Sequence, residues 1–254
     1  MGSQESEFPR LYHAHHARHM EDLSFWMELA DAYRSPILEL GCGTGRVLLN
    51  LASAGHQVIG LDLDAGMLTV LQENMPDNLR ARVNVLRGDF TRFHLASRFN
   101  LILLPCNTYS TLSSVERSAL LSCVARHLAP GGVFVASLPN PVLLRQLPSY
   151  GSPQVEEVFP HPDDGSPVQV TSSWQRAAQG VTIYWDYDYI LQGQEQHLSR
   201  AVQHQRATVQ NYLAELHEKG FKLVTLYGDY DRSTYYREAQ NLIIVAGFQA
   251  LTQA

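Results

Sequence analysis

Between residues 37 and 138 the chain alternates short apolar runs with amphipathic stretches. The apolar runs have the length of buried strands, and the stretches between them carry apolar residues at helical spacing. A repeated strand–helix order predicts a mostly parallel sheet with helices on both faces, the doubly wound arrangement of α/β proteins. In such sheets, ligands bind at the carboxyl ends of the strands. The predicted strands are residues 37–40, 58–62, 83–87, 101–104 and 133–136.

Helical patterns flank this region on both sides. Residues 11–33 carry the apolar stripe of one or two helices, which the Ser35-Pro36 pair ends. Residues 208–219 read as another helix, and Gly220 closes it as a C-terminal cap. Two final strands are predicted at residues 221–227 and 242–246.

An antiparallel insertion is predicted between these parts. Prolines punctuate residues 139–167, which therefore read as loop-rich. Three runs rich in Val, Thr, Tyr, Trp and Ile follow, and they predict antiparallel hairpins. Side chains alternate along a strand, so Trp185, Tyr187 and Tyr189 share one face, which packs on the core, lines a pocket or meets a neighbouring subunit. The three runs are residues 168–174, 181–191 and 196–205.

Composition narrows the class of protein. The chain has 254 residues, a formal net charge of −6 and no apolar run as long as a membrane span. No signal-peptide pattern is visible, and Cys42, Cys106 and Cys123 have neither paired nor zinc-binding spacing. Free thiols suit a reducing compartment, and the acidic balance argues against DNA or RNA as substrate. We therefore expect a cytoplasmic protein with no membrane or nucleic-acid partner.

The chemistry begins where the first strand ends. Gly41, Gly43 and Gly45 follow Glu39 at alternate positions and lead into a helix. Glycine permits a left-handed turn and a close approach of the backbone to a ligand. Asp62 ends the next strand, where a carboxylate can accept the hydroxyls of a ribose or cap the following helix. The glycine spacing is tighter than the nicotinamide G-x-G-x-x-G pattern, and no Lys-Ser/Thr pair marks a P-loop.

Five motifs in register carry a family resemblance. Glu39-Leu-Gly-Cys-Gly-Thr-Gly45 resembles the first motif of class I S-adenosylmethionine-dependent methyltransferases, and Asp62 resembles the ribose-binding acid of that family. Arg87-Gly-Asp-Phe90 is similar to the adenine-binding motif. Pro105-Cys-Asn-Thr-Tyr-Ser110 is similar to the loop on the substrate side, and His127-Leu-Ala-Pro-Gly-Gly132 to the turn into the fifth strand. The resemblance covers residues 12–138, and the C-terminal strands fit as well.

The resemblance implies a fold, a cofactor and an organisation of the chain. The fold is a seven-stranded Rossmann-like sheet with the antiparallel insertion after its fifth strand. The cofactor is S-adenosyl-L-methionine, which becomes S-adenosyl-L-homocysteine. We expect one domain over residues 1–254, because the insertion has too few residues for a core of its own. Its parts are a helical segment (1–35), a cofactor-binding core (36–140), a hairpin lid (141–206) and a closing helix with strands (207–249).

The resemblance also implies residue roles. The three loop glycines approach the methionine part of the cofactor, and Asp62 and Leu63 lie at the ribose. Met67 covers the adenine face, while Asp89 and Phe90 bind the adenine edge. Pro105 lies near the sulfonium, and Tyr12 closes the site from the N-terminal segment. The implied cofactor-binding residues are Tyr12, Gly41, Gly43, Gly45, Asp62, Leu63, Met67, Asp89, Phe90 and Pro105.

The methyl acceptor is less defined. Asn107 and Tyr109 are candidates for the acceptor pocket, as are His204 and Arg206 of the insertion. Because Asn107 offers no strong base, the sequence favours an amine of a small molecule. An O-methyltransferase, a nicotinamide-dependent oxidoreductase and a cofactor-binding protein without catalysis stay open, and so does a homodimer. His15 and His19 have i, i+4 spacing, but no HExxH motif or third ligand accompanies them, so we expect no metal site.

Overall fold

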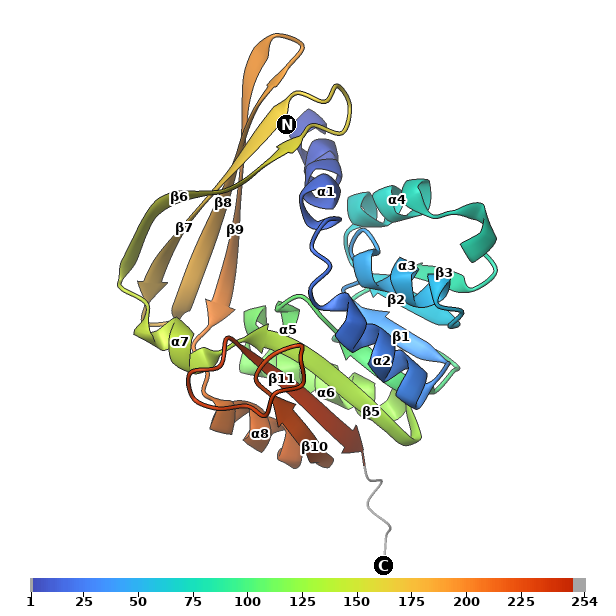
Figure 1. Cartoon of the computed structure of the whole chain (residues 1–254). Helices are drawn as coiled ribbons and strands as arrows, with labels where there is room; N and C mark the ends of the chain where they lie inside the picture. The colour runs from blue at the N-terminus through green and yellow to red at the C-terminus, as the bar shows by residue number, and fades with distance from the viewer. Residues whose placement is uncertain (1, 249–254) are drawn as a thin grey trace, which may run out of the picture.

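The computed structural model describes residues 2–248, and its central feature is a seven-stranded sheet (Figure 1). The strand order is β10-β11-β5-β4-β1-β2-β3. Strands β1 to β5 pair in parallel, whereas β11 lies antiparallel between β5 and β10. The doubly wound prediction is therefore confirmed. The strands are β1 (Ile37–Leu40), β2 (Val58–Asp62), β3 (Val83–Arg87), β4 (Phe99–Leu104), β5 (Leu128–Pro139), β10 (Phe221–Tyr227) and β11 (Asn241–Phe248).

Helices cover both faces of this sheet, and the side chains of β4 show why. Leu101 and Leu103 belong to the apolar cluster under α2, α3 and α4, while Ile102 and Leu104 belong to the cluster under α6 and α8. Alternate residues of a strand point to opposite faces, so a continuous apolar run serves two cores. The helices of the α/β part are α2 (Leu23–Tyr33), α3 (Arg46–Ser53), α4 (Ala65–Asn74), α5 (Thr108–Thr111), α6 (Ser114–His127) and α8 (Val209–Glu218), with a short 3-10 turn η1 (Asp77–Leu79).

A second, antiparallel sheet follows β5, as the sequence predicts. Its order is β6-β7-β8-β9. Helix α1 (Gly2–His16) lies beside this sheet in Figure 1. Tyr187 and Tyr189 of the sheet are buried with Leu11 of α1, and Trp185 packs against the same cluster. The shared aromatic face thus packs on α1. The strands are β6 (Tyr150–Pro160), β7 (Pro167–Ala177), β8 (Gly180–Leu191) and β9 (Gln194–Gln205).

Three details differ from the sequence prediction. The stretch predicted to be loop-rich contains strand β6 and the short helix α7 (Pro141–Gln146). Strand β6 lies at the sheet edge, where a proline can stand without breaking a hydrogen bond between strands. Its register shifts near Pro153. The first helix begins at Gly2, well before the predicted start.

Among residues 2–248, no helix is both long and apolar enough to cross a membrane.

Candidate active site

The glycine loop joins β1 to α3 at the carboxyl edge of the central sheet. Gly41, Gly43 and Gly45 have φ angles of +66°, +52° and +88°, a region that side chains with a Cβ adopt only under strain. A Cβ on Gly45 would lie 2.8 Å from Leu71, so this glycine serves helix packing. A Cβ on Gly43 would meet no atom within 4 Å. The loop therefore presents its backbone to open space at Gly43.

Asp62 holds this loop from the end of β2. Its Oδ2 accepts a hydrogen bond from the Gly43 amide at 2.7 Å, and its Oδ1 accepts one from the Asp64 amide at 2.9 Å. Burial raises the pKa of the Asp62 carboxyl above its usual range. Asp64, not Asp62, caps α4, because its Oδ1 accepts the amides of Gly66 and Met67. The helix-cap alternative for Asp62 is thereby set aside.

Three segments of the chain meet at Gly41. A Cβ built there would lie 3.8 Å from the Phe90 ring, and 3.9 Å from a methyl group of Leu104 and from that of Thr108. Phe90 follows β3, Leu104 ends β4 and Thr108 begins α5. The fold thus brings the glycine loop, the loop after β3 and the loop after β4 to one place, as the parallel topology requires.

The remaining residues predicted to bind the adenosine line the same edge. The Asp89 carboxylate accepts hydrogen bonds from the Thr91 amide and hydroxyl and pairs with Arg92 at 3.0 Å. The Thr91 hydroxyl holds the pKa of Asp89 below its usual value. Leu63 is 60% exposed although it is apolar, and Met67 is half-buried in the first turn of α4. An exposed leucine beside Asp62 is a surface that a ligand can cover.

A charged cluster that the motif analysis did not predict lies at the start of α3. Arg46 donates to Asp22 Oδ2 at 2.7 Å and to the His19 carbonyl at 2.7 Å, and its Nη2 lies 3.3 Å from Cys106 Sγ. Asp22 also accepts from the Trp26 indole at 2.9 Å. The pair ties the N-terminal segment to the glycine-loop helix and to the loop after β4.

Glu39 is the second residue whose role the sequence left undefined. Its side chain is buried, and its Oε2 has no hydrogen-bond partner among the described residues. Burial raises the pKa of this carboxyl well above its usual value, although the charge of Arg46 opposes the shift. A buried carboxylate oxygen without a donor is costly unless a ligand supplies one. Glu39 therefore suits a cationic or hydrogen-bond-donating ligand at the glycine loop.

Tyr12 reaches the same region from α1. Burial raises the pKa of its phenol, and the charges that act on it include those of Arg46 and Asp62. Tyr230, from the loop between β10 and β11, packs its ring 5.8 Å from that of Phe25 and 6.2 Å from that of Trp26. Tyr12 and Tyr230 bring two hydroxyl-bearing side chains from the ends of the chain towards Arg46.

The loop after β4 is strained. Cys106 and Asn107 have φ angles of +60° and +65°, which are uncommon for residues with a Cβ and tend to occur at functional sites. The amide oxygen of Asn107 is buried without a hydrogen-bond partner in the described chain. Pro105 is buried, and Cys106 is open to solvent. Asn107 thus offers an unused acceptor on the loop where the substrate side is predicted.

Tyr109 lies elsewhere. Its side chain is fully buried and packs on Phe134 and Tyr212 in the cluster beneath α6 and α8. The structure thus places Tyr109 in the core, and its assignment to the acceptor pocket stays a prediction. The residue falls on the inner side of the short helix α5, where an aromatic ring fills the core.

Comparison with known proteins identifies the class. Residues 37–132 match the family model described as a methyltransferase domain. The cypemycin N-terminal methyltransferase of a Streptomyces species is 26% identical over 210 residues, which cover 82% of this chain and 81% of that protein. The dTDP-3-amino-3,4,6-trideoxy-alpha-D-glucopyranose N,N-dimethyltransferase of Streptomyces venezuelae is 30% identical over 115 residues, 42% of this chain and 46% of that protein. A S-adenosylmethionine-dependent methyltransferase structure from Clostridium acetobutylicum shares the fold, with a TM-score of 0.79, 15% identity and coverage of 96% and 99%.

Residues 37–132 thus form a methyltransferase domain, and the motifs of this region resemble those of the class I S-adenosylmethionine-dependent methyltransferases. The residues at the glycine loop fit this cofactor in three respects. Gly43 faces open space, the Glu39 carboxylate lacks a donor, and Asp62 stands at the tip of the neighbouring strand. The sequence did not predict the contact between Arg46 and Asp22, because the two residues are 24 positions apart and belong to no shared motif.

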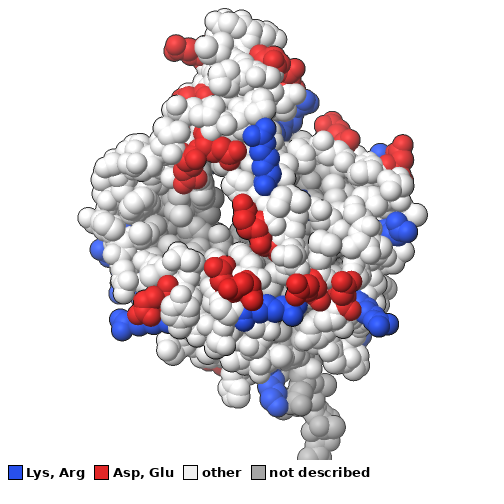
Figure 2. Space-filling view, in the orientation of Figure 1, with Lys and Arg blue, Asp and Glu red and all other residues white. Residues whose placement is uncertain are grey.

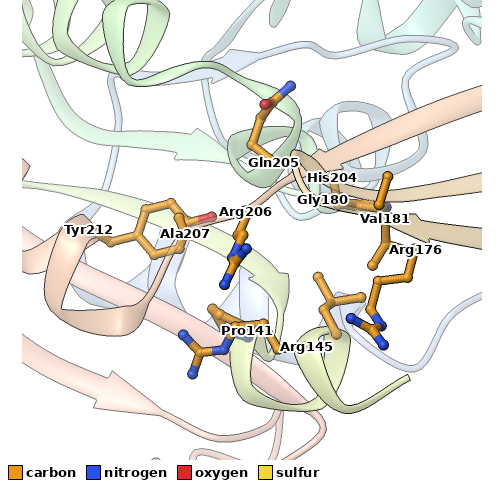
Figure 3. A pocket seen from close by; sticks show the side chains of 12 residues that line it. Pro141, Arg145, Arg176, Gly180, Val181, His204, Gln205, Arg206, Ala207 and Tyr212 are labelled. Atoms are coloured by element: carbon orange, nitrogen blue, oxygen red, sulfur yellow. The ribbon is translucent and has the colours of Figure 1, made fainter. Parts of the chain in front are cut away.

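A pocket of the methyltransferase lies between α7, α8 and the ends of β7 to β9 (Figure 3). It is partly open to solvent, and Arg145, Arg176 and Arg206 line it. His204 lines the pocket. The Ser110 hydroxyl donates its proton to the Asn107 carbonyl, so it accepts a hydrogen bond from His204 Nδ1 at 2.8 Å. His204 and Arg206, both predicted for the acceptor pocket, line this cavity, and its role as the acceptor pocket stays a prediction.

The surface charge agrees with the sequence expectation. On the face that Figure 2 shows, acidic and basic side chains are mixed, and no continuous basic patch is present. The same face is hollowed between the antiparallel sheet and the central sheet. A hollow of mixed charge suits a small molecule better than a nucleic-acid backbone.

Proposed function

We propose that this methyltransferase transfers the methyl group of S-adenosylmethionine to the nitrogen of a small-molecule amine. The names of two relatives support the acceptor class, since one is an N-terminal methyltransferase and the other an amino-sugar N,N-dimethyltransferase. The observation that carries the proposal is the unpaired amide oxygen of Asn107 in a strained loop next to Cys106. An amine N–H can donate to that oxygen.

The cofactor would be held by the residues that the resemblance indicates. Gly41, Gly43 and Gly45 would take the methionine part, and we add Glu39, whose unpaired Oε2 can accept from the amino group of the cofactor. Asp62 and Leu63 take the ribose, Met67 and Phe90 take the adenine, and Asp89 orders the loop beside it. The cofactor supplies an activated methyl group, and the protein supplies binding and alignment. Alignment of two bound reactants accounts for roughly 7–11 kcal/mol in favourable cases.

The acceptor side lacks a strong base, which suits an amine. Burial lowers the pKa of His204 to about 4, so its imidazole is a weak base. Burial raises the pKa of Tyr12, which keeps its phenol protonated at neutral pH. The Arg46 charge is balanced by Asp22. An amine that arrives unprotonated carries its own lone pair and needs no proton acceptor before it attacks, whereas a sugar or phenol hydroxyl does.

The three arginines of the pocket indicate which chemical group the methyl acceptor carries besides its amine. Among residues 7–248, whose side chains the structure describes, no carboxylate lies within ion-pair distance of Arg145, Arg176 or Arg206. Guanidinium groups recognise phosphates and carboxylates. We therefore place an anionic group of the acceptor in this pocket, and its amine towards Asn107.

Mass spectrometry of a single scaffold can test the proposal. An amino-sugar nucleotide, which offers both an amine and hydroxyls, is incubated with purified enzyme and S-adenosylmethionine, and the corresponding amino sugar without phosphate serves as its uncharged form. Fragmentation then locates the added methyl. We expect N-methylation, faster for the phosphorylated compound than for its uncharged form. Methylation of oxygen would instead favour an O-methyltransferase, and no product across the panel despite cofactor binding would favour a protein without catalysis.

The variant Asn107→Ala separates the acceptor from the cofactor. We expect it to lower kcat/KM for the amine by roughly 5- to 150-fold, the loss of a hydrogen bond in a desolvated site. Its affinity for S-adenosylhomocysteine should stay within twofold of the parent. Arg206→Gln is the matched variant for the anionic group and should raise KM for the phosphorylated acceptor only. An equal loss for charged and uncharged acceptors would contradict the role of the pocket.

A further inference from the structure

Three side chains with metal-binding atoms meet at the junction of α1 and β6. His15 lies in the last turn of α1, His19 follows three residues after the end of that helix, and Glu157 belongs to β6. Glu157 Oε2 lies 3.2 Å from His19 Nε2 and 3.8 Å from His15 Nε2. One donor atom of each residue lies within 4.8 Å of the other two. The sequence could not show this group, because the carboxylate is 138 residues beyond His19.

These separations suit one tetrahedral ion. Zinc binds histidine nitrogen and carboxylate oxygen at about 2.0–2.2 Å, which places neighbouring donors roughly 3.3–3.6 Å apart in a tetrahedron. The distances from Glu157 Oε2 to His19 Nε2 and His15 Nε2, 3.2 and 3.8 Å, lie within a few tenths of an ångström of that range, and the donor atoms of the two histidines lie within 4.8 Å of each other. Two histidines and one carboxylate are also a recurrent zinc ligand set, with a water molecule in the fourth position.

The His15 ring is oriented for such a role. Its side chain is buried, stacks on Phe159 at 5.5 Å between ring centroids and hydrogen-bonds through Nδ1 to the Tyr187 hydroxyl at 3.1 Å. Nδ1 is thereby occupied, and Nε2 is left facing Glu157. A metal-binding histidine usually makes such a bond through its second nitrogen, which fixes the tautomer and the ring.

We propose that His15, His19 and Glu157 bind a divalent transition-metal ion of the zinc type. The ion would tie the end of α1 to β6 of the antiparallel sheet. Tyr12 lies one turn earlier on α1, so the ion would also fix the helix that carries Tyr12 to the cofactor site. The role is structural, and it does not depend on the identity of the methyl acceptor.

The charges around the site are compatible with binding. Arg18 is the nearest competing cation, with its Nη1 3.9 Å from Glu157 Oε1, and its side chain is mostly exposed. It approaches the carboxylate oxygen that is not shared with the histidines, so an ion at Oε2 need not displace it.

Calorimetric titration with zinc chloride tests the proposal. The full chain is used without an affinity tag, after treatment with a chelator, and without cofactor. We expect saturable binding of one Zn²⁺ per chain. His19→Gln and Glu157→Gln should each weaken it by at least about 100-fold, since even outer partners of metal ligands contribute 10- to 100-fold. Both side chains are partly exposed, so neither substitution removes core packing.

His13→Gln is the matched control, because it lies on the same helix outside the cluster. It should bind Zn²⁺ within threefold of the parent. Replacement of zinc by cobalt adds an optical readout, and the visible absorption of a four-coordinate complex should appear in the parent and in His13→Gln only. No saturable binding by the parent overturns the proposal. Binding that survives both His19→Gln and Glu157→Gln also overturns it, since the ion would then lie elsewhere.

Discussion

Gly43→Ala separates the cost of backbone strain from the loss of ligand space. The Gly43 backbone has φ of +52°, and a Cβ there would meet no protein atom within 4 Å. The methyl group therefore enters the space that we assign to the cofactor. Gly55 provides the matched control, because it has φ of +101°, also faces open space and lies after α3, away from the glycine loop.

The expected magnitudes follow from these two observations. An alanine in left-handed backbone costs about 1–2 kcal/mol, so both variants should lose stability by about that amount. For a chain of this length, 1 kcal/mol lowers Tm by roughly 2–4 °C. Only Gly43→Ala also crowds the ligand. Overpacking by one methyl costs about 1–3 kcal/mol, which weakens binding roughly 5- to 150-fold.

Calorimetry with S-adenosylhomocysteine, paired with thermal unfolding in its absence, measures both quantities. We expect Gly43→Ala and Gly55→Ala to have similar Tm values without ligand. Only Gly43→Ala should lose affinity. If Gly43→Ala bound the ligand as tightly as Gly55→Ala, the cofactor would not occupy the space above Gly43, and the assignment of the loop would be refuted.

Two further predictions concern acids of the site. Asp62→Ala should weaken S-adenosylhomocysteine binding roughly 10- to 150-fold, because it removes a charged acceptor and leaves the Gly43 amide without its partner. Asp64→Ala should lower stability by about 1 kcal/mol, because it removes the cap of α4, and should change the affinity little. Equal affinities in these two variants, measured by calorimetry, would contradict the ribose assignment. Burial raises the pKa of Glu39 in the folded chain. Above the pKa of the unfolded carboxyl, the unfolded chain therefore binds fewer protons than the folded chain, and the free energy of unfolding falls as pH rises. Glu39→Gln should therefore gain stability relative to the parent as pH rises above about 5, and parallel stability curves of the two proteins above that pH would show that folding does not raise the pKa of Glu39.

The parts of the fold that sequence predicted well are those set by local spacing. Alternate glycines after an apolar run define the loop, because few other residues adopt the left-handed backbone found at Gly41 and Gly43. Period-two alternation placed Tyr187 and Tyr189 on one face of β8, and both are buried against α1. The carboxyl ends of β1, β2 and β4 converge for a topological reason, so residues after these strands could be expected to meet.

Long-range pairing explains what was missed. Strand β6 contains prolines that indicate a loop, but an edge strand accepts them because half of its backbone groups need no partner. Arg46 and Asp22 carry no motif, and their contact exists only because α2 packs against α3. Tyr109 was assigned to a pocket from its place in a loop, although one turn of helix rotates it into the core.

The difference between local motifs and long-range contacts also explains why the sequence predicts the cofactor better than the methyl acceptor. The cofactor end is built by consecutive strand–loop–helix units, so its residues appear in sequence as compact motifs and its chemistry can be recognised from them. The acceptor end that we propose is assembled from distant parts: Asn107 after β4, His204 and Arg206 at the end of β9, and Arg145 on α7. Specificity for the acceptor therefore depends on how the antiparallel sheet sits over the central one. Substitutions at Arg145 or Arg206 should change which acceptor is used while leaving cofactor binding intact, because neither residue lies on the glycine loop or at Asp62.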